Sequence, residues 1–237
     1  MPARHCLVTG TNRGLGLEFA RQLLARGDRV VATCRHPGKA TALNQLAGEH
    51  PGRLHVLPLD VADPRAIDGL LRELLLLGDD SADDRFDLLV NCAGVLHSGE
   101  RFGSVGAANL DDSFRTNAMG PFLLTQALAP RLADGACVAN ISSELGSIGH
   151  LTRFGTPSYN ISKAAQNMAT ALLAAALRPR DIAVVAMHPG WVQTDMGGEG
   201  ANLTPRESVA GLLQAIDALT PADSGSFLDW RGEAWPW

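Results

Sequence analysis

The stretch Thr9-Gly10-Thr11-Asn12-Arg13-Gly14-Leu15-Gly16 lies between a short apolar run and a longer amphipathic one. Its three glycines permit a tight turn, close approach of the backbone to a bound group and close packing of the helix that follows. The free N–H groups and positive potential at the start of such a helix favour phosphate. The spacing G-x-x-x-G-x-G differs from the general dinucleotide fingerprint, and a plain tight turn is the alternative. Its place in the first strand–turn–helix unit of the chain favours a dinucleotide site.

Short apolar runs alternate with longer amphipathic segments along the rest of the chain. Strands are expected at His5–Thr9, Arg29–Thr33, Leu54–Leu57, Phe86–Asn91, Ala136–Ile141 and Ile182–Met187. Helices are expected near residues 15–26, 38–47, 64–77, 111–131, 158–177 and 205–219. Continuous apolar strands separated by helices are typical of a parallel sheet covered on both faces. The pattern predicts an α/β fold with a Rossmann-type, doubly wound parallel sheet, and the lack of a linker predicts a single domain over residues 1–237.

Charges of both signs are scattered along the chain, and the formal net charge is −5. A basic face is therefore not expected, which argues against binding to nucleic acid or to an anionic membrane. The start Met1-Pro2-Ala3-Arg4-His5 lacks the apolar run of a signal peptide, and the cluster Leu70 to Leu77 is too short and too charged to span a bilayer. We expect a cytoplasmic protein.

The cysteines show no C-x-x-C pair and no paired histidine spacing, so neither a disulfide nor a metal site is expected. Each falls in or beside an apolar run, which predicts a buried, reduced thiol that packs as a small hydrophobic group. The four cysteines are Cys6, Cys34, Cys92 and Cys137.

The end of the second expected strand bears on which dinucleotide is bound. An acidic residue there would hold the ribose 2′-hydroxyl of NAD, but the chain has Thr33-Cys34-Arg35. Arg35, together with Arg13 of the glycine stretch, would instead bind a 2′-phosphate through charge-assisted hydrogen bonds. The interpretation favours NADP(H), the alternative being that both arginines are solvated surface charges.

Polar residues also follow the third, fourth and fifth expected strands, and ligands of open α/β sheets bind at these carboxyl ends. Asp60-Val61 is expected to contact the adenine, with Asp60 accepting from its amino group, and Asn91-Cys92-Ala93-Gly94 to lie along the adenosine ribose. Asn140-Ile141-Ser142-Ser143 places hydroxyl groups at the same edge. Asn117 precedes Pro121, which must bend or break its helix and so free polar groups that hold water.

Tyr159, the only tyrosine, lies four residues before Lys163 at the head of an alanine-rich helical stretch. This spacing puts the phenol and the ammonium on one helix face. An adjacent ammonium stabilises the phenolate and lowers the pKa of the tyrosine toward the working range, so the phenol becomes able to transfer a proton. Taken alone, the spacing is more often that of a solvated helix face.

The motifs, in this order and spacing, resemble the short-chain dehydrogenase/reductase family over essentially the whole chain: Thr9 to Gly16, Asp60-Val61, Asn91 to Gly94, Asn117, Ser142-Ser143, Tyr159-x-x-x-Lys163 and Pro189 to Thr194. Finer features resemble its C-factor and sniffer-like carbonyl reductase branch: Thr33-Cys34-Arg35, Leu145 to Ile148, His188 to Gly198 and the aromatic tail Gly225 to Trp237. With this agreement the solvated-face alternative for Tyr159 and Lys163 loses most of its weight.

The resemblance implies a set of catalytic residues. Ser143 would polarise a substrate carbonyl, and Tyr159 would donate the proton. Lys163 would lower the pKa of Tyr159 and contact the nicotinamide ribose, and Asn117 would hold a relay water. The spacing leaves open whether Ser142 or Ser143 faces the substrate, and Ser143 is preferred because it is nearer the loop.

The resemblance also implies the cofactor contacts, with Val192 and Thr194 fixing the carboxamide. Cys92 departs from the family motif Asn-Asn-Ala-Gly, although its backbone can still serve. The expected contacts are Gly10, Asn12, Arg13, Gly14, Leu15, Gly16, Arg35, Asp60, Val61, Asn91, Ala93, Gly94, Tyr159, Lys163, Pro189, Gly190, Val192 and Thr194.

The hypothesis is an oxidoreductase that reduces a ketone or aldehyde with NADPH. Residues 189–204 are the expected substrate lid, and their mainly apolar, glycine-rich composition favours a hydrophobic carbonyl substrate. The alternative is a regulatory NADP(H)-binding signalling protein of the C-factor type with incidental turnover. A homodimer through the helices near 111–131 and 158–177 is expected, with a tetramer or a monomer left open.

Overall fold

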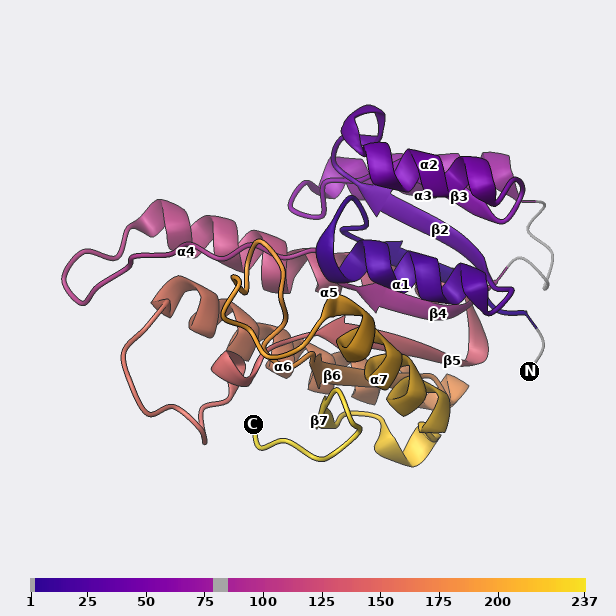
Figure 1. Cartoon of the computed structure of the whole chain (residues 1–237). Coiled ribbons are helices and arrows are strands. Elements are labelled where there is room, and N and C mark those ends of the chain that lie inside the picture. The colour runs from indigo at the N-terminus through magenta and orange to yellow at the C-terminus, as the bar shows by residue number, and fades with distance from the viewer. Residues whose placement is uncertain (1–2, 79–84) are drawn as a thin grey trace.

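The computed structural model describes residues 3–78 and 85–237, so the first two residues of the N-terminal stretch considered for a signal peptide lie outside it. Within this part, seven strands form one parallel sheet in the order β3-β2-β1-β4-β5-β6-β7 (Figure 1). The strands are β1 His5–Thr9, β2 Arg29–Cys34, β3 Leu54–Pro58, β4 Phe86–Asn91, β5 Leu132–Ile141, β6 Ala183–His188 and β7 Phe227–Asp229.

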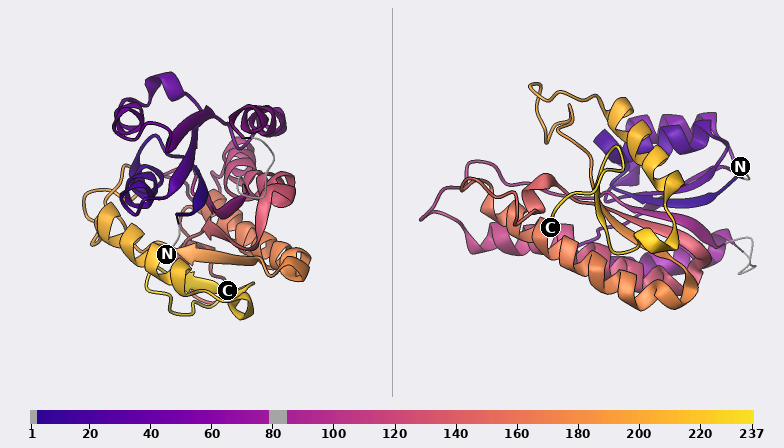
Figure 2. Two further views of the ribbon diagram at one scale, coloured as in Figure 1. Left: turned by 90° about the vertical axis from the view of Figure 1, so that its right-hand side faces the viewer. Right: turned by 90° about the horizontal axis from the view of Figure 1, so that it is seen from below.

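Seven α-helices connect and cover the strands within the described residues. They are α1 Gly14–Ala25, α2 Thr41–Glu49, α3 Pro64–Leu77, α4 Ala107–Phe114, α5 Gly120–Leu128, α6 Pro157–Leu177 and α7 Pro205–Ala218. Helices α1, α2 and α7 pack on one face of the sheet, and α3, α5 and α6 pack on the other (Figure 2). The Rossmann-type, doubly wound parallel sheet predicted from the sequence is confirmed.

Alternating strand residues build the two apolar cores. Cys6 and Val8 of β1 face the core under α1, α2 and α7, whereas Leu7 between them faces the core under α3, α5 and α6. Because successive side chains of a strand point to opposite faces, a strand covered on both sides must be apolar throughout. This explains the continuous apolar runs that mark the strands in the sequence.

Two elements differ from the sequence expectation. Strand β7 was not expected, because Phe227–Asp229 has only three residues and pairs with the distant β6. The single helix expected over 111–131 is instead α4, a π-helical segment at Arg115–Met119, and α5. Pro121 cannot donate a helical hydrogen bond and crowds the preceding turn, and the wider π turn before it accommodates this.

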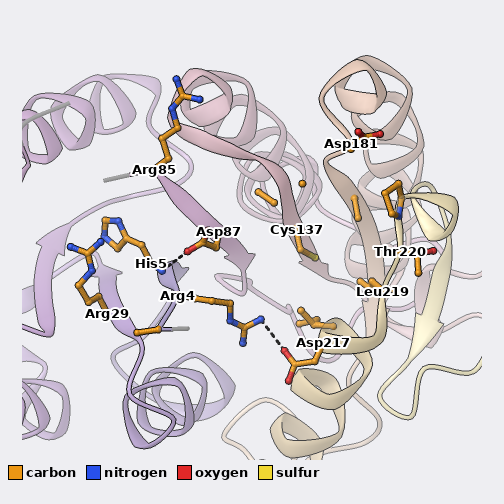
Figure 3. Close-up of a pocket in the computed structure, with 16 residues that line it drawn as sticks. Arg4, His5, Arg29, Arg85, Asp87, Cys137, Asp181, Asp217, Leu219 and Thr220 are labelled. Atoms are coloured by element: carbon orange, nitrogen blue, oxygen red, sulfur yellow. Dashed lines mark hydrogen bonds and ion pairs between the residues drawn. The ribbon is translucent and has the colours of Figure 1, made fainter. Parts of the chain in front are cut away.

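A cavity of about 480 Å³ lies at the amino ends of the strands (Figure 3). It is opposite the edge that carries residues 10–16, the glycine loop between β1 and α1. Two of its carboxylates already have partners: Asp217 pairs with Arg4 at 2.8 Å, and Asp87 accepts from the backbone N–H of His5 at 2.7 Å. In open parallel sheets ligands bind at the carboxyl ends of the strands. The candidate site is therefore sought at the other edge.

Helix α7 begins with a reciprocal cap that pairs backbone N–H groups of its first turn with side chains. The Thr204 hydroxyl accepts from the Glu207 N–H at 3.2 Å, and the Glu207 carboxylate accepts from the Thr204 N–H at 2.9 Å. Thr204→Ala is expected to lower the free energy of unfolding by about 1 kcal/mol, measured by urea denaturation. Thr220 makes the same box on the three-residue helix Pro221–Asp223. Thr220→Ala is the matched control. If it lowers the free energy of unfolding as much as Thr204→Ala does, the loss does not come from capping the long helix α7.

Candidate active site

The glycine loop joins β1 to α1 and leaves no room for a side chain at positions 10 and 16. Gly10 and Gly14 adopt positive φ angles of 72° and 57°. A Cβ on Gly10 would lie 2.7 Å from the Ala93 Cα, and one on Gly16 would lie 2.3 Å from the Gly10 carbonyl oxygen. The loop is thus a bare backbone surface at a helix N-terminus, which suits a pyrophosphate. These residues fit a dinucleotide.

Thr9 fixes the loop to the neighbouring strand end. Its hydroxyl accepts from the backbone N–H groups of Cys92 and Ala93, both at 3.0 Å. The sequence argument quoted Thr9 only as the first residue of the glycine motif and missed this role. A hydroxyl at the carboxyl end of an otherwise apolar strand was the available signal.

Arg13 lies within this loop, and Arg35 follows β2, the strand that pairs with β1. Arg13 pairs with Asp195 of the 189–204 segment, and the two side chains are 68% and 73% exposed. Arg35 follows β2, is exposed, and makes no ion pair within the described part of the chain. Both guanidinium groups are therefore accessible to an anionic ligand.

The residues after β3 and β4 are placed differently from one another. Asp60 is half-buried and accepts from the Ala62 N–H at 3.0 Å, while Val61 is buried with its carbonyl against Gly120. The Asn91 side chain turns into the interior.

The Asn91 amide donates to Asn140 Oδ1 at 2.8 Å and to Thr125 Oγ1 at 3.1 Å. Its side chain therefore ties β4 to β5 and α5 and does not reach the loop edge. Ala93 and Gly94 lie at the loop edge itself. Ala93 is against Gly10, and Gly94 is beside Asn117 and Lys163. As whole residues, Cys92 and Cys137 are half-buried, whereas Cys6 and Cys34 are buried; all four cysteines are free.

Tyr159 and Lys163 lie one above the other in the first two turns of α6. The Lys163 Nζ is 5.6 Å from the centroid of the Tyr159 ring, and the residues are only 3% and 7% exposed, respectively. The ammonium donates to the Ile141 carbonyl at 2.7 Å and to Gln166 Oε1 at 2.9 Å. The spacing therefore marks a buried face and not a solvated one.

The two serines after β5 have separate partners. The Ser142 hydroxyl donates to Asn167 Oδ1 at 2.6 Å inside the protein. Ser143 accepts from the Leu145 N–H at 3.1 Å, and its hydroxyl also hydrogen-bonds the Tyr159 phenol. Of the pair, Ser143 is the one beside the tyrosine.

Burial controls the protonation of this cluster. It raises the pKa of Tyr159 to about 12, opposed by hydrogen bonding from Ser143. It also lowers the pKa of Lys163 to about 8, opposed by the Cys92 thiol. The sequence had predicted a lowered tyrosine pKa; the loss of solvation of the phenolate outweighs its neighbours here.

Asn117 and Glu100 hold the surrounding elements together. The Asn117 amide, buried in the π segment, exchanges hydrogen bonds with the backbone of Val95 at 2.8 and 2.9 Å and donates to Ser162 at 2.9 Å. Glu100 accepts from the N–H and hydroxyl of Ser158 at the start of α6, at 3.1 and 2.7 Å. The sequence argument did not identify Glu100, because no local pattern links it to α6.

The 189–204 segment folds back on itself beside the glycine loop. The backbone N–H of Gln193 donates to Leu203, and Leu203 donates to Trp191. A Cβ on Gly14 would lie 3.6 Å from the Thr194 methyl carbon, and Val192 is buried. Pro189 accepts from Ser208 of α7, and Gly190 has a positive φ of 81°. Thr194 and Asp195 thus lie directly over the loop.

Known proteins resemble the chain along nearly its whole length. The sequence model of the short chain dehydrogenase family matches residues 4–202. The chain is 44% identical over 153 residues to C-signal of Myxococcus xanthus, covering 64% of this chain and 92% of that protein. It is 33% identical over 235 residues, 98% of each chain, to 1-hydroxy-2-glutathionyl-2-methyl-3-butene dehydrogenase of Rhodococcus sp. (strain AD45).

Solved structures agree with these sequence relatives. The carbonyl reductase Sniffer of D. melanogaster superposes with a TM-score of 0.93 at 33% identity, covering 99% of this chain and 100% of that one. An NADPH-bound carbonyl reductase from chicken fatty liver gives 0.91 at 38% identity, with complete coverage of both chains. The chain therefore belongs to the short chain dehydrogenase family, in its carbonyl reductase branch.

Proposed function

We propose that this protein is an NADP(H)-dependent oxidoreductase that reduces the ketone or aldehyde of a mainly apolar substrate, with Tyr159 as the proton donor. One observation carries the proposal: Ser143, Tyr159 and Lys163 form a buried cluster next to the glycine loop. Ala93 and Gly94 connect the cluster to the loop. Ala93 lies against Gly10, and a Cβ on the adjacent Gly94 would lie 3.9 Å from the Lys163 ammonium.

The cofactor is NADP(H), as in the NADPH-bound relative from chicken liver. The glycine loop would hold the pyrophosphate, and Arg13 and Arg35 would bind the 2′-phosphate. Thr194 and Val192, beside the same loop, would contact the nicotinamide end. When bound, NADPH supplies the hydride for carbonyl reduction.

The chain itself supplies the proton and the electrostatic stabilisation. The Ser143 hydroxyl and the Tyr159 phenol would both donate hydrogen bonds to the substrate oxygen as negative charge develops on it. Tyr159 would then release its proton to that oxygen. A phenol with a pKa of about 12 stays protonated at neutral pH, and the Lys163 ammonium would stabilise the phenolate left behind.

Exposed apolar side chains around this edge support an apolar substrate. They lie on three segments: the loop after β4, the segment between β5 and α6, and residues 189–204. The residues are Phe102, Leu145, Ile148, Leu151, Phe154, Trp191 and Met196. Phe102 and Phe154 meet edge to face with their centroids 5.7 Å apart, which joins the first two segments. We propose residues 189–204 as the lid that closes over such a substrate.

A second candidate function is cofactor-dependent signalling with incidental turnover. The 44% identity with C-signal favours it over the part of the chain that the two share. The buried tyrosine–lysine pair favours chemistry, because a sensor has no use for a proton donor. Reduction of a simple dicarbonyl or quinone with NADPH discriminates between them.

We also propose a homodimer. Helix α6 presents Ile161, Met168 and Leu172 to solvent, and Phe114 of α4 is similarly exposed. Such an apolar stripe suits a helix-to-helix interface. Light scattering distinguishes a dimer from a tetramer or a monomer.

The role of Tyr159 as the proton donor can be tested by substitution. Tyr159→Phe removes the phenol proton and one oxyanion donor, so kcat for carbonyl reduction with NADPH is expected to fall by at least about 100-fold. The cofactor affinity, measured by NADPH fluorescence, should change little. Unaltered turnover across a panel of ketones, aldehydes and quinones would rule out the assignment.

The two serines form a matched pair. Ser143→Ala is expected to lower kcat by about 100-fold to 1,000-fold, because it deletes a donor to the substrate oxygen. Ser142→Ala removes only the internal bond to Asn167 and is expected to reduce stability more than kcat. Equal kinetic losses in the two variants would contradict the assignment of Ser143.

Arg35 is tested by coenzyme preference. Arg35→Ala is expected to raise the KM for NADPH by about tenfold or more, because a charge-assisted bond to the 2′-phosphate is lost, and to leave that for NADH unchanged. Arg21, on α1 and 3.9 Å from Glu18, is an exposed control whose replacement should affect neither coenzyme. A parallel rise for NADPH and NADH would count against 2′-phosphate recognition.

A further inference from the structure

Lys163 depends on one side-chain acceptor that the mechanism above does not use. Its ammonium has two hydrogen-bond acceptors in the described structure, the Ile141 carbonyl at 2.7 Å and Gln166 Oε1 at 2.9 Å. The carbonyl belongs to the end of β5 and is fixed by the sheet. Gln166 is therefore the adjustable partner of this buried cation.

Gln166 is itself buried, with 1% of its surface exposed, and its amide nitrogen has no hydrogen-bond partner within the described residues. An unpaired buried N–H costs stability, and an apolar side chain of the same size would avoid that cost. Within the described residues, the Gln166 side chain makes one hydrogen bond, in which its oxygen accepts from the Lys163 ammonium. Packing alone therefore does not account for a glutamine here.

The backbone of Gln166 is held firmly. Its carbonyl accepts from the Thr170 hydroxyl at 2.9 Å, and that hydroxyl accepts from the Asn140 amide at 2.9 Å. Asn140 lies on β5, so this chain of bonds anchors the third turn of α6 to the sheet. Gln166 can thus place its side-chain oxygen reproducibly.

Few other charges face the ammonium. Tyr159 on the same helix and Cys92 after β4 are the titratable groups that act on the cluster in the described structure. The neighbours from β5 and the π segment, the Ile141 carbonyl and the Asn117 amide, are uncharged. A neutral acceptor such as Gln166 therefore has a large share in stabilising the charged form of Lys163.

We infer that Gln166 is a positioning residue for Lys163, whose side-chain oxygen keeps the buried amine protonated and beside the Tyr159 ring. The effect on turnover rests on the proposed role of Lys163 in carbonyl reduction. Burial already lowers the pKa of Lys163 to about 8, so loss of an acceptor would bring deprotonation into the physiological range. The alkaline limit of activity would move with it.

The chain contains two lysines, Lys39 and Lys163, so protein labelled with 13C at the lysine Cε gives two signals to titrate by NMR. Gln166→Met is expected to lower the Lys163 midpoint by about one pH unit, the shift that corresponds to one lost hydrogen bond to a charged group. The signal of the exposed Lys39 should not move. Gln45→Met, at an exposed glutamine bonded to Glu49, is the matched control.

Gln166→Glu tests the opposite sign, because a carboxylate beside the ammonium favours the charged form and raises the midpoint. A Lys163 midpoint that is the same in the native protein and the Met variant overturns the inference. If the Met variant does not fold, an unchanged or lowered midpoint in the Glu variant overturns it instead.

Activity gives the second measurement. The alkaline limb of the kcat/KM profile should move in the same direction as the NMR midpoint, which is toward lower pH in Gln166→Met. At about one pH unit above the new midpoint, the activity of this variant should fall by roughly tenfold. An overall loss with an unmoved limb indicates a merely structural role and counts against the inference. Shifted NMR midpoints without carbonyl turnover by the native protein support the inference and refute the proposed function.

Discussion

The backbone contact between Gly10 and Ala93 governs the layout of the molecule. Strands β1 and β4 are neighbours, and their loops meet with no space for a side chain at position 10. The Thr9 hydroxyl reinforces the contact by binding the N–H groups of Cys92 and Ala93. The order of the strands reverses here, and the residues after β4 meet the glycine loop through Ala93 and the lysine of α6 through Gly94.

Helix α6 buries a polar face where a helix of this length would ordinarily bury apolar residues. Tyr159, Ser162, Lys163, Gln166 and Thr170 are all buried, and most of their polar atoms find partners on β5, the π segment or α6 itself. Such a network is costly unless it is satisfied, but it holds its members in one arrangement. The arrangement that the proposed proton transfer requires is thus part of the core.

Sequence periodicity predicted the sheet, six of its strands and the face shared by Tyr159 and Lys163, because each depends on local spacing. It could not give the inward direction of the Asn91 side chain, because the partners Thr125 and Asn140 come from elements far along the chain. It also left Ser142 and Ser143 unresolved, since adjacent residues differ only in the direction that the strand end gives them. The pKa of Tyr159 depends on total burial, which no motif encodes.

The burial of the sole tyrosine beside Ser143 has a practical consequence. Spectroscopic signals of tyrosine usually average over many residues. In this protein the whole tyrosine signal comes from one buried residue, Tyr159. Biosynthetic incorporation of fluorotyrosine would place a fluorine reporter at Tyr159 alone. The protein can therefore carry a site-specific probe of ligand entry without any change to its sequence.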